Sequence, residues 1–168
     1  LDVAMSLGTG TLTLAGGELI VGTGELFTNP LEMDSGKIRI LDGPLNAPLL
    51  LRDQVVFSGG VLAGKISGNG TFVLSNVNST DVTVFSSDTS DFRGAFVVDS
   101  GVLYPERFSG DLQIRANGAL QLRDQTVVRK VILQGGTIRT TQLTSGNLVG
   151  DANISGNAQL EVSNGTRL

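Results

Sequence analysis

The chain has 168 residues, a length that suits one domain, and its 16 acidic and 12 basic side chains give a formal net charge of −4. It contains no cysteine and no histidine, which excludes disulfides, thiolate chemistry, the commonest metal ligand and the usual general base near neutral pH. We therefore expect residues 1–168 to form a single domain without catalytic, cofactor-binding or metal-binding residues. The start at Leu1 instead of Met suggests a fragment of a longer chain.

Short strands with one buried face recur along the whole sequence. Many of the 23 glycines are followed two residues later by Leu, Ile, Val or Phe, and apolar residues then alternate with polar ones. This period of two predicts strands, each introduced by a glycine that is free to take positive φ at a tight turn. In chain order the predicted strands are 10–14, 17–21, 36–40, 70–74, 94–98, 110–114 and 118–122.

Helix is nearly excluded, because glycine interrupts almost every window that could hold three helical turns. The exception is residues 119–134, which are free of glycine and contain several good helix formers. We predict strand there, since the Leu-x-Leu opening and the valine-rich centre fit a pleated strand better than a helical period.

Three phrases of the sequence occur twice, in the same order. ISGNGTFVLSN (66–76) returns as ISGNAQLEVSN (154–164), LLLRDQ (49–54) returns as LQLRDQ (120–125), and a Gly-Gly pair follows each copy of the second phrase. This order indicates an ancestral unit that was duplicated and later acquired insertions at turns.

Repeated short strands separated by turns of variable length predict an all-β fold, a right-handed parallel β-helix of about seven or eight coils and on the order of 35 Å long. Small aliphatic side chains should fill the tube, with Phe72, Leu74, Leu160 and Val162 pointing inward and Asn76 and Asn164 pairing in ladders at the corners. The alternative is a β-sandwich, whose hairpins could turn at Asn69-Gly70, Asn117-Gly118 and Asn164-Gly165.

Two groups of charged residues are candidate sites. The pairs Arg52-Asp53 and Arg123-Asp124 could stack on one face of the tube, although a solvated ion pair at a strand end is the favoured interpretation. Asp88 and Asp91 lie in a Ser/Thr-rich loop, where two carboxylates could act on sugar or bind calcium. Two carboxylates supply too few oxygens for a calcium cage.

Two further features bear on contacts with partners. Residues 104–108 (Tyr-Pro-Glu-Arg-Phe) combine aromatic and charged side chains beside a proline, and they form either a protruding contact loop or a corner between coils. Asn-x-Ser/Thr triplets could accept glycans in a eukaryotic secretory chain, but such triplets arise by chance in a sequence rich in turn residues. They begin at Asn69, Asn78, Asn153 and Asn164.

Residues 84–106 resemble the repeat found in passenger domains of bacterial autotransporters. Phe92, Gly94, Phe96 and Val98 match its aromatic-x-Gly-x-aliphatic-x-Val pattern, and Gly101-x-Leu103 matches the Gly-x-Leu that follows. The likeness is clearest over 66–122. It implies a right-handed parallel β-helix displayed outside a Gram-negative cell, where such stalks act in adhesion, in self-association or as carriers of effector regions.

We therefore expect a non-catalytic, secreted or cell-surface stalk or adhesin segment. Its partners would be a host surface, a glycan receptor or neighbouring copies of itself, without nucleic acid, membrane contact or cofactors. The alternative is a β-helix that binds or cleaves polysaccharide, similar to a phage tailspike or a pectin lyase. A glycan-cleaving enzyme should carry a groove lined by three or more clustered carboxylates and by aromatics, whereas a stalk should show scattered Ser, Thr and Asn.

Overall fold

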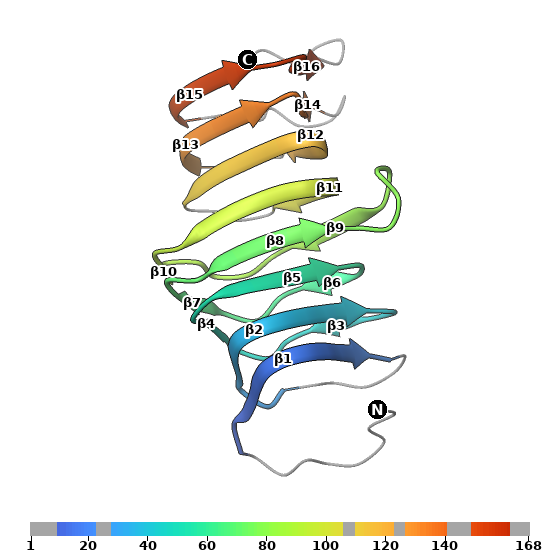
Figure 1. Cartoon of the computed structure of the whole chain (residues 1–168), viewed down its shortest axis with the longest axis vertical. Helices are drawn as coiled ribbons and strands as arrows, with labels where there is room; N and C mark the ends of the chain where they lie inside the picture. Colours follow the sequence, from blue (N-terminus) through green and yellow to red (C-terminus); the bar gives the residue numbers. More distant parts are fainter. Residues whose placement is uncertain (1–9, 23–27, 106–109, 123–126, 141–148, 162–168) are drawn as a thin grey trace.

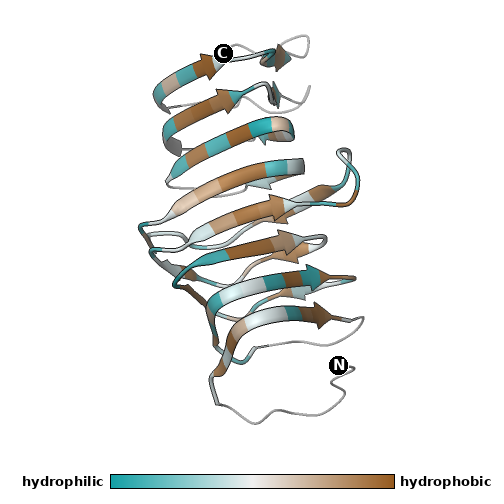
Figure 2. Ribbon diagram, viewed as in Figure 1, coloured by the Kyte–Doolittle hydropathy of each residue, from teal (hydrophilic) through white to brown (hydrophobic). Residues whose placement is uncertain are grey.

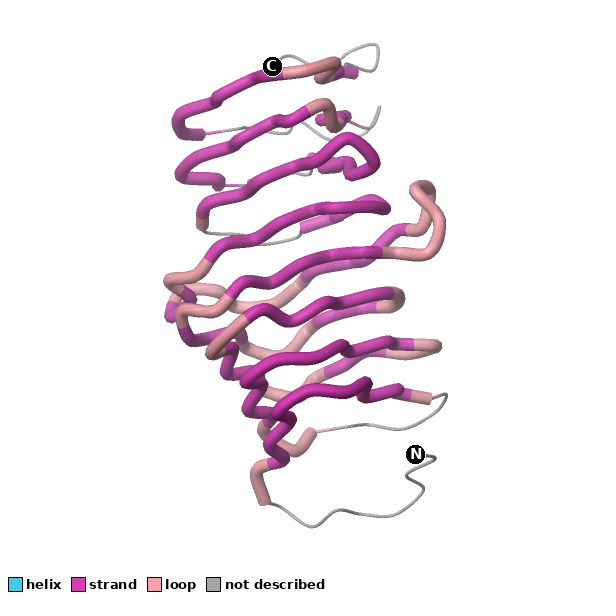
Figure 3. Tube along the Cα trace, in the orientation of Figure 1, coloured by secondary structure: helices cyan, strands magenta, loops and turns pink. Residues whose placement is uncertain are grey.

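A computed structural model describes residues 10–22, 28–105, 110–122, 127–140 and 149–161. Strands in these ranges coil into a solenoid of about seven turns, and the described residues contain no helix (Figures 1 and 3). The strands are β1 (Leu12–Val21), β2 (Leu31–Ile40), β3 (Pro44–Leu45), β4 (Leu49–Leu51), β5 (Gln54–Ser58), β6 (Val61–Leu62), β7 (Ile66–Gly68), β8 (Thr71–Ser75), β9 (Val82–Phe85), β10 (Asp91–Phe92), β11 (Ala95–Pro105), β12 (Asp111–Leu122), β13 (Val127–Gln134), β14 (Thr137–Thr140), β15 (Val149–Ser155) and β16 (Gln159–Glu161).

The strands form three faces, and every pairing between these strands is parallel. The first face contains the starts of β1 and β2, then β4, β7 and β10. The second contains the ends of β1 and β2, then β5, β8, the first halves of β11 and β12, β13 and β15. The third contains β3, β6, β9, the second halves of β11 and β12, β14 and β16. The predicted parallel β-helix is confirmed.

The β-sandwich alternative is wrong. It requires two-residue hairpins, which join antiparallel strands, whereas the described strands of this chain pair in parallel. Asn69-Gly70 lies at the corner between the first and second faces, and Asn117-Gly118 lies at the corner between the second and third. Asn164-Gly165 falls outside the described residues. The run 119–134 forms strand wherever it is described, in β12 and β13, as predicted.

Inward side chains stack in columns along the rod, as the period of two requires. Figure 2 shows apolar and polar residues alternating along β12 and β15. Phe72 and Leu74 are buried as predicted. Leu160 follows Leu120 and Ile138 in its column but is 56% exposed, since no described coil stacks on β16. Val162 lies outside the described residues.

Phenylalanine fills the middle of the rod, where composition had suggested small aliphatics. The Phe72 ring lies 5.3 Å from the rings of Phe57 and Phe96, and 5.8 Å from that of Phe85. Phe92 stacks edge-on against Phe96 at 4.6 Å. All five side chains are buried. The prediction is thus wrong for these central coils, because parallel register brings residues from successive coils into one cluster.

The repeated phrases mark corners of the coil, but two of the three do not return at the same corner. Residues 66–76 pass from the first face to the second, whereas 154–161 pass from the second to the third. LLL at 49–51 lies on the first face and LQL at 120–122 on the third. Only the Gly-Gly pairs keep their place, since Gly59-Gly60 and Gly135-Gly136 both come directly before a strand of the third face. The other two phrases occur at different corners in their two copies. For these two phrases, the prediction that whole coils were duplicated is wrong.

Corner glycines serve two different purposes. Gly17, Gly36 and Gly101 take positive φ, at 80°, 119° and 89°. A second group has no positive φ, and a β-carbon there would overlap backbone atoms of a neighbouring coil; its members are Gly64, Gly70, Gly94, Gly118 and Gly136. At Gly94 a β-carbon would overlap the carbonyl oxygen of Gly70 on the preceding coil. These glycines let the backbones of successive coils approach each other at the corners.

We expect Gly94→Ala to lower the free energy of unfolding by about 3 kcal/mol, because the carbonyl that it meets is backbone and cannot rotate away. The matched control is Gly22→Ala, where a β-carbon meets no atom within 4 Å and should change stability by about 0.5 kcal/mol or less. Urea unfolding of the two variants measures the difference. Equal midpoints for both variants would contradict this account of the corners.

Candidate functional site

The longest described excursion from the coil joins β8 to β9 and is fixed at its base by Asn76. The Asn76 side chain accepts a hydrogen bond from the Gly59 N–H at 2.8 Å and donates to the Asp81 carbonyl at 2.9 Å and to the Thr83 hydroxyl at 3.2 Å. Its backbone carbonyl accepts from the Ser100 hydroxyl at 2.7 Å. Asn76 therefore ties three successive coils together where the chain leaves the rod.

Asn76 occupies a corner, as predicted, but the expected asparagine ladder is wrong. Its neighbours on the adjacent coils are Gly59 and Gly101, and a β-carbon at Gly101 would lie 2.5 Å from the Asn76 Nδ2. A larger residue at Gly101 would displace the amide, whereas a β-carbon at Gly59 would overlap the backbone carbonyl oxygen of Ile40. Asn164, the other predicted member of the ladder, lies outside the described residues.

Residues 76–81, termed here the corner loop, are closed by a turn of their own. The Asn78 side chain donates to the Asp81 carboxylate at 3.2 Å, and the Asp81 N–H donates to the Asn78 carbonyl at 3.2 Å. Val77 beside this turn is 89% exposed. The corner loop thus holds a bare apolar side chain in solvent, on a base that is fixed by buried hydrogen bonds.

The corner loop projects from the third face of the rod. Val102 lies on the outer side of β11, since its neighbour Leu103 belongs to the core, yet Val102 is only 1% exposed. Its N–H donates to the Asp81 carbonyl at 2.8 Å, which continues the parallel pairing of β9 with β11. Figure 1 shows the loop rising from β8 and β9 toward the later coils, and its residue Ser79 forms a step beside β12.

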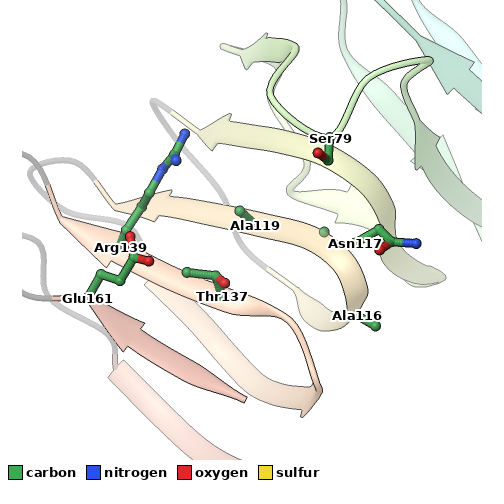
Figure 4. A pocket seen from close by; sticks show the side chains of 8 residues that line it. Ser79, Ala116, Asn117, Ala119, Thr137, Arg139 and Glu161 are labelled. Carbon is green, nitrogen blue, oxygen red and sulfur yellow. The ribbon is translucent and has the colours of Figure 1, made fainter. Parts of the chain in front are cut away.

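A groove of about 250 Å³ lies beside this step (Figure 4). Figure 4 shows Ser79 on the corner loop at one end, Arg139 and Glu161 at the other, and Ala119 and Thr137 between them. The lining residues come from the loop and from β12, β14 and β16, and are Ser79, Ala116, Asn117, Gly118, Ala119, Thr137, Arg139 and Glu161. It is a shallow polar depression across successive coils.

The Arg52 guanidinium lies at a strand end and pairs with carboxylates of the preceding coil. It contacts Glu32 at 2.9 Å and Asp34 at 3.7 Å. Asp53 points back to its own backbone, where it accepts a hydrogen bond from the Gln54 N–H at 2.8 Å. Arg52 thus forms an ion pair at a strand end, but its partners are Glu32 and Asp34 and not the adjacent Asp53. Arg123-Asp124 lies outside the described residues.

Asp88 and Asp91 form part of a small charged cluster with Lys65. Asp91 makes an ion pair with Lys65, and the Asp88 carboxylate accepts a hydrogen bond from the Ser90 N–H at 2.9 Å. The Asp91 hydrogen bond, the Asp91 charge and, more weakly, Asp88 raise the pKa of Lys65 above its ordinary value of 10.5. No cluster of three or more potential metal-ligating side chains occurs within the described ranges.

The remaining candidates do not meet at one place. Tyr104 and Pro105 lie in β11, where Tyr104 is half-buried in register with Val84, and residues 106–108 fall outside the described residues. Asn69 lies at a corner, Asn78 in the corner loop and Asn153 on β15. The groove residues were missed because their contact depends on register between distant strands. Two sequence signals fell in the corner loop: the triplet at Asn78 and the corner position predicted for Asn76.

No family model, curated protein or solved structure matches the chain. None of the described residues belongs to a helix that is long and apolar enough to cross a membrane.

Proposed function

We propose that this chain is a non-catalytic, surface-exposed β-helical segment of a secreted bacterial autotransporter passenger, and that it acts in adhesion. The corner loop is the observation that carries the proposal. It presents Val77 and polar groups on a base held by Asn76, so little further ordering is required when a partner binds.

The distribution of charge supports a stalk. The ion pairs of the described residues each join one coil to the next, as Glu18 does with Arg39 at 3.2 Å and Asp99 with Arg115 at 3.0 Å. The groove beside the corner loop is lined by a single carboxylate, that of Glu161, together with Ser, Thr and Asn. This composition resembles the scattered polar surface expected of a stalk more than a glycan-cleaving cleft.

Adhesion is tested by binding of the fluorescently labelled chain to cultured epithelial cells. We expect saturable binding that Val77→Ser weakens about tenfold, because an exposed apolar side chain on an ordered loop gains most from burial in an interface. The matched control is Leu41→Ser, which removes a 58% exposed side chain from the corner between β2 and β3 and should bind normally. Absence of saturable binding would overturn the proposal, as would release of reducing ends from a polysaccharide panel.

A further inference from the structure

The groove beside the corner loop has a floor without long side chains. Gly118 and Ala119 lie on β12, and Thr137 follows Ala119 in register on β14. The corner loop bounds one side at Ser79, and Arg139 and Glu161 stand at the other (Figure 4). Because Ala119 is only 8% exposed, a small ring that lies on this floor would be held mainly by the polar groups of the rim.

The rim offers hydrogen bonds of both kinds and no net charge. Arg139 donates only, Glu161 accepts only, and the Asn117 amide and the hydroxyls of Ser79 and Thr137 can do either. Arg139 and Glu161 are register partners on adjacent strands, roughly 5 Å apart along the rod. A ligand with many hydroxyl groups could pair with all of these donors and acceptors, because each hydroxyl group both donates and accepts hydrogen bonds.

Other classes of ligand fit less well. An extended peptide would need a free strand edge along the floor, but the floor strands β12 and β14 are hydrogen-bonded on both sides. Apolar anchors would need deep pockets, whereas this floor is Ala and Gly. An anion would meet Glu161 directly beside Arg139. The volume of about 250 Å³ lies below the roughly 300–1,000 Å³ of sites for drug-sized molecules.

We propose that this groove binds a neutral saccharide of one or two rings, with Arg139 and Glu161 holding neighbouring hydroxyl groups and Ala119 lying under the ring. This assignment rests on the proposed adhesive function and names its ligand class. Register explains why the site was not visible as a motif, since its residues come from separate coils.

The test titrates neutral disaccharides against the chain by ligand-observed saturation-transfer NMR. The probes are lactose, maltose, cellobiose and N,N′-diacetylchitobiose, with sialyllactose as the anionic comparison. We expect at least one neutral probe to bind and Arg139→Ala to weaken it about tenfold, as for loss of a hydrogen bond from a charged donor. The matched control is Arg52→Ala, which removes an ion-paired arginine from the first face and should bind like the wild type.

A second variant guards against loss of the fold. Thr137→Tyr fills the groove with a residue that strands accept, so it should abolish binding while the unfolding midpoint stays close to that of the wild type. Binding of the anionic probe alone, binding of no probe, or neutral binding that neither variant reduces would overturn the assignment. Cell adhesion without saccharide binding would support the adhesive function and overturn the saccharide site in the groove. Saccharide binding without cell adhesion would support the saccharide site and overturn the adhesive function.

Discussion

Replacing Phe72 with alanine should lower the free energy of unfolding by about 3–5 kcal/mol, the largest effect expected of any single change in this chain. Phe72 is fully buried and contacts three other phenylalanine rings: Phe57 on the preceding coil, Phe96 on the following coil and Phe85 on its own coil. The neighbouring strands are paired through their backbones and cannot close the cavity. Urea unfolding followed by far-UV circular dichroism measures the change.

The position of the cavity adds a second expectation. In a solenoid each coil contacts only its neighbours, so a weak centre lowers the coupling between the two ends of the rod. The Phe72→Ala transition should therefore broaden or split in two. Phe72→Leu keeps most of the volume and should cost about 1 kcal/mol, and Val77→Ala in the exposed corner loop should have almost no effect. Equal losses for Phe72→Ala and Val77→Ala would contradict the buried cluster.

The local sequence pattern was sufficient to predict the β-helical coil, but it did not predict which side chains of different coils contact each other. Alternation predicted that Phe72 and Leu74 point inward, because the side-chain period of a strand does not depend on its partners. The phenylalanine cluster was missed because composition counts residues without placing them. Phe57, Phe72 and Phe96 meet only once turn lengths have set the register between coils.

Turns were the least predictable part of the sequence. A glycine at a corner is required either because it takes positive φ, as Gly101 does, or because the backbone of the neighbouring coil lies too close for a β-carbon, as at Gly94. The sequence around one glycine does not distinguish these two roles, since the close backbone belongs to another coil. Ser79 and Glu161 line opposite ends of one groove for a similar reason, since the stacking of coils places them there. The repeated phrases gave no guide to this placement, because copies of one phrase lie at different corners.

Asn76→Ala should lower the free energy of unfolding by about 2–4 kcal/mol, since it removes the acceptor of the Gly59 N–H and takes one hydrogen bond each from the Asp81 carbonyl and the Thr83 hydroxyl. The last two groups keep their bonds with the Val102 N–H and the Gly59 carbonyl. The matched control is Asn78→Ala in the same loop. Its bonds to the Asp81 carboxylate are exposed, and their loss should cost about 1 kcal/mol or less. Amide hydrogen exchange should quicken across the corner loop in the first variant more than in the second.

Asn76→Asp separates the hydrogen bonds from simple packing, because it keeps the size of the side chain and its acceptor while removing both amide donors. At neutral pH the introduced carboxylate faces the Asp81 carbonyl, and burial raises its pKa in the folded state, so the variant is destabilised above the unfolded pKa of about 3.9. As the pH falls through the folded pKa, the group takes up a proton and can donate again. The stability difference from wild type should then shrink, as denaturant midpoints at pH 7 and pH 4 would show. A difference that stays constant between these two pH values would mean that packing alone, and not donation to Asp81 and Thr83, fixes the corner loop to the rod.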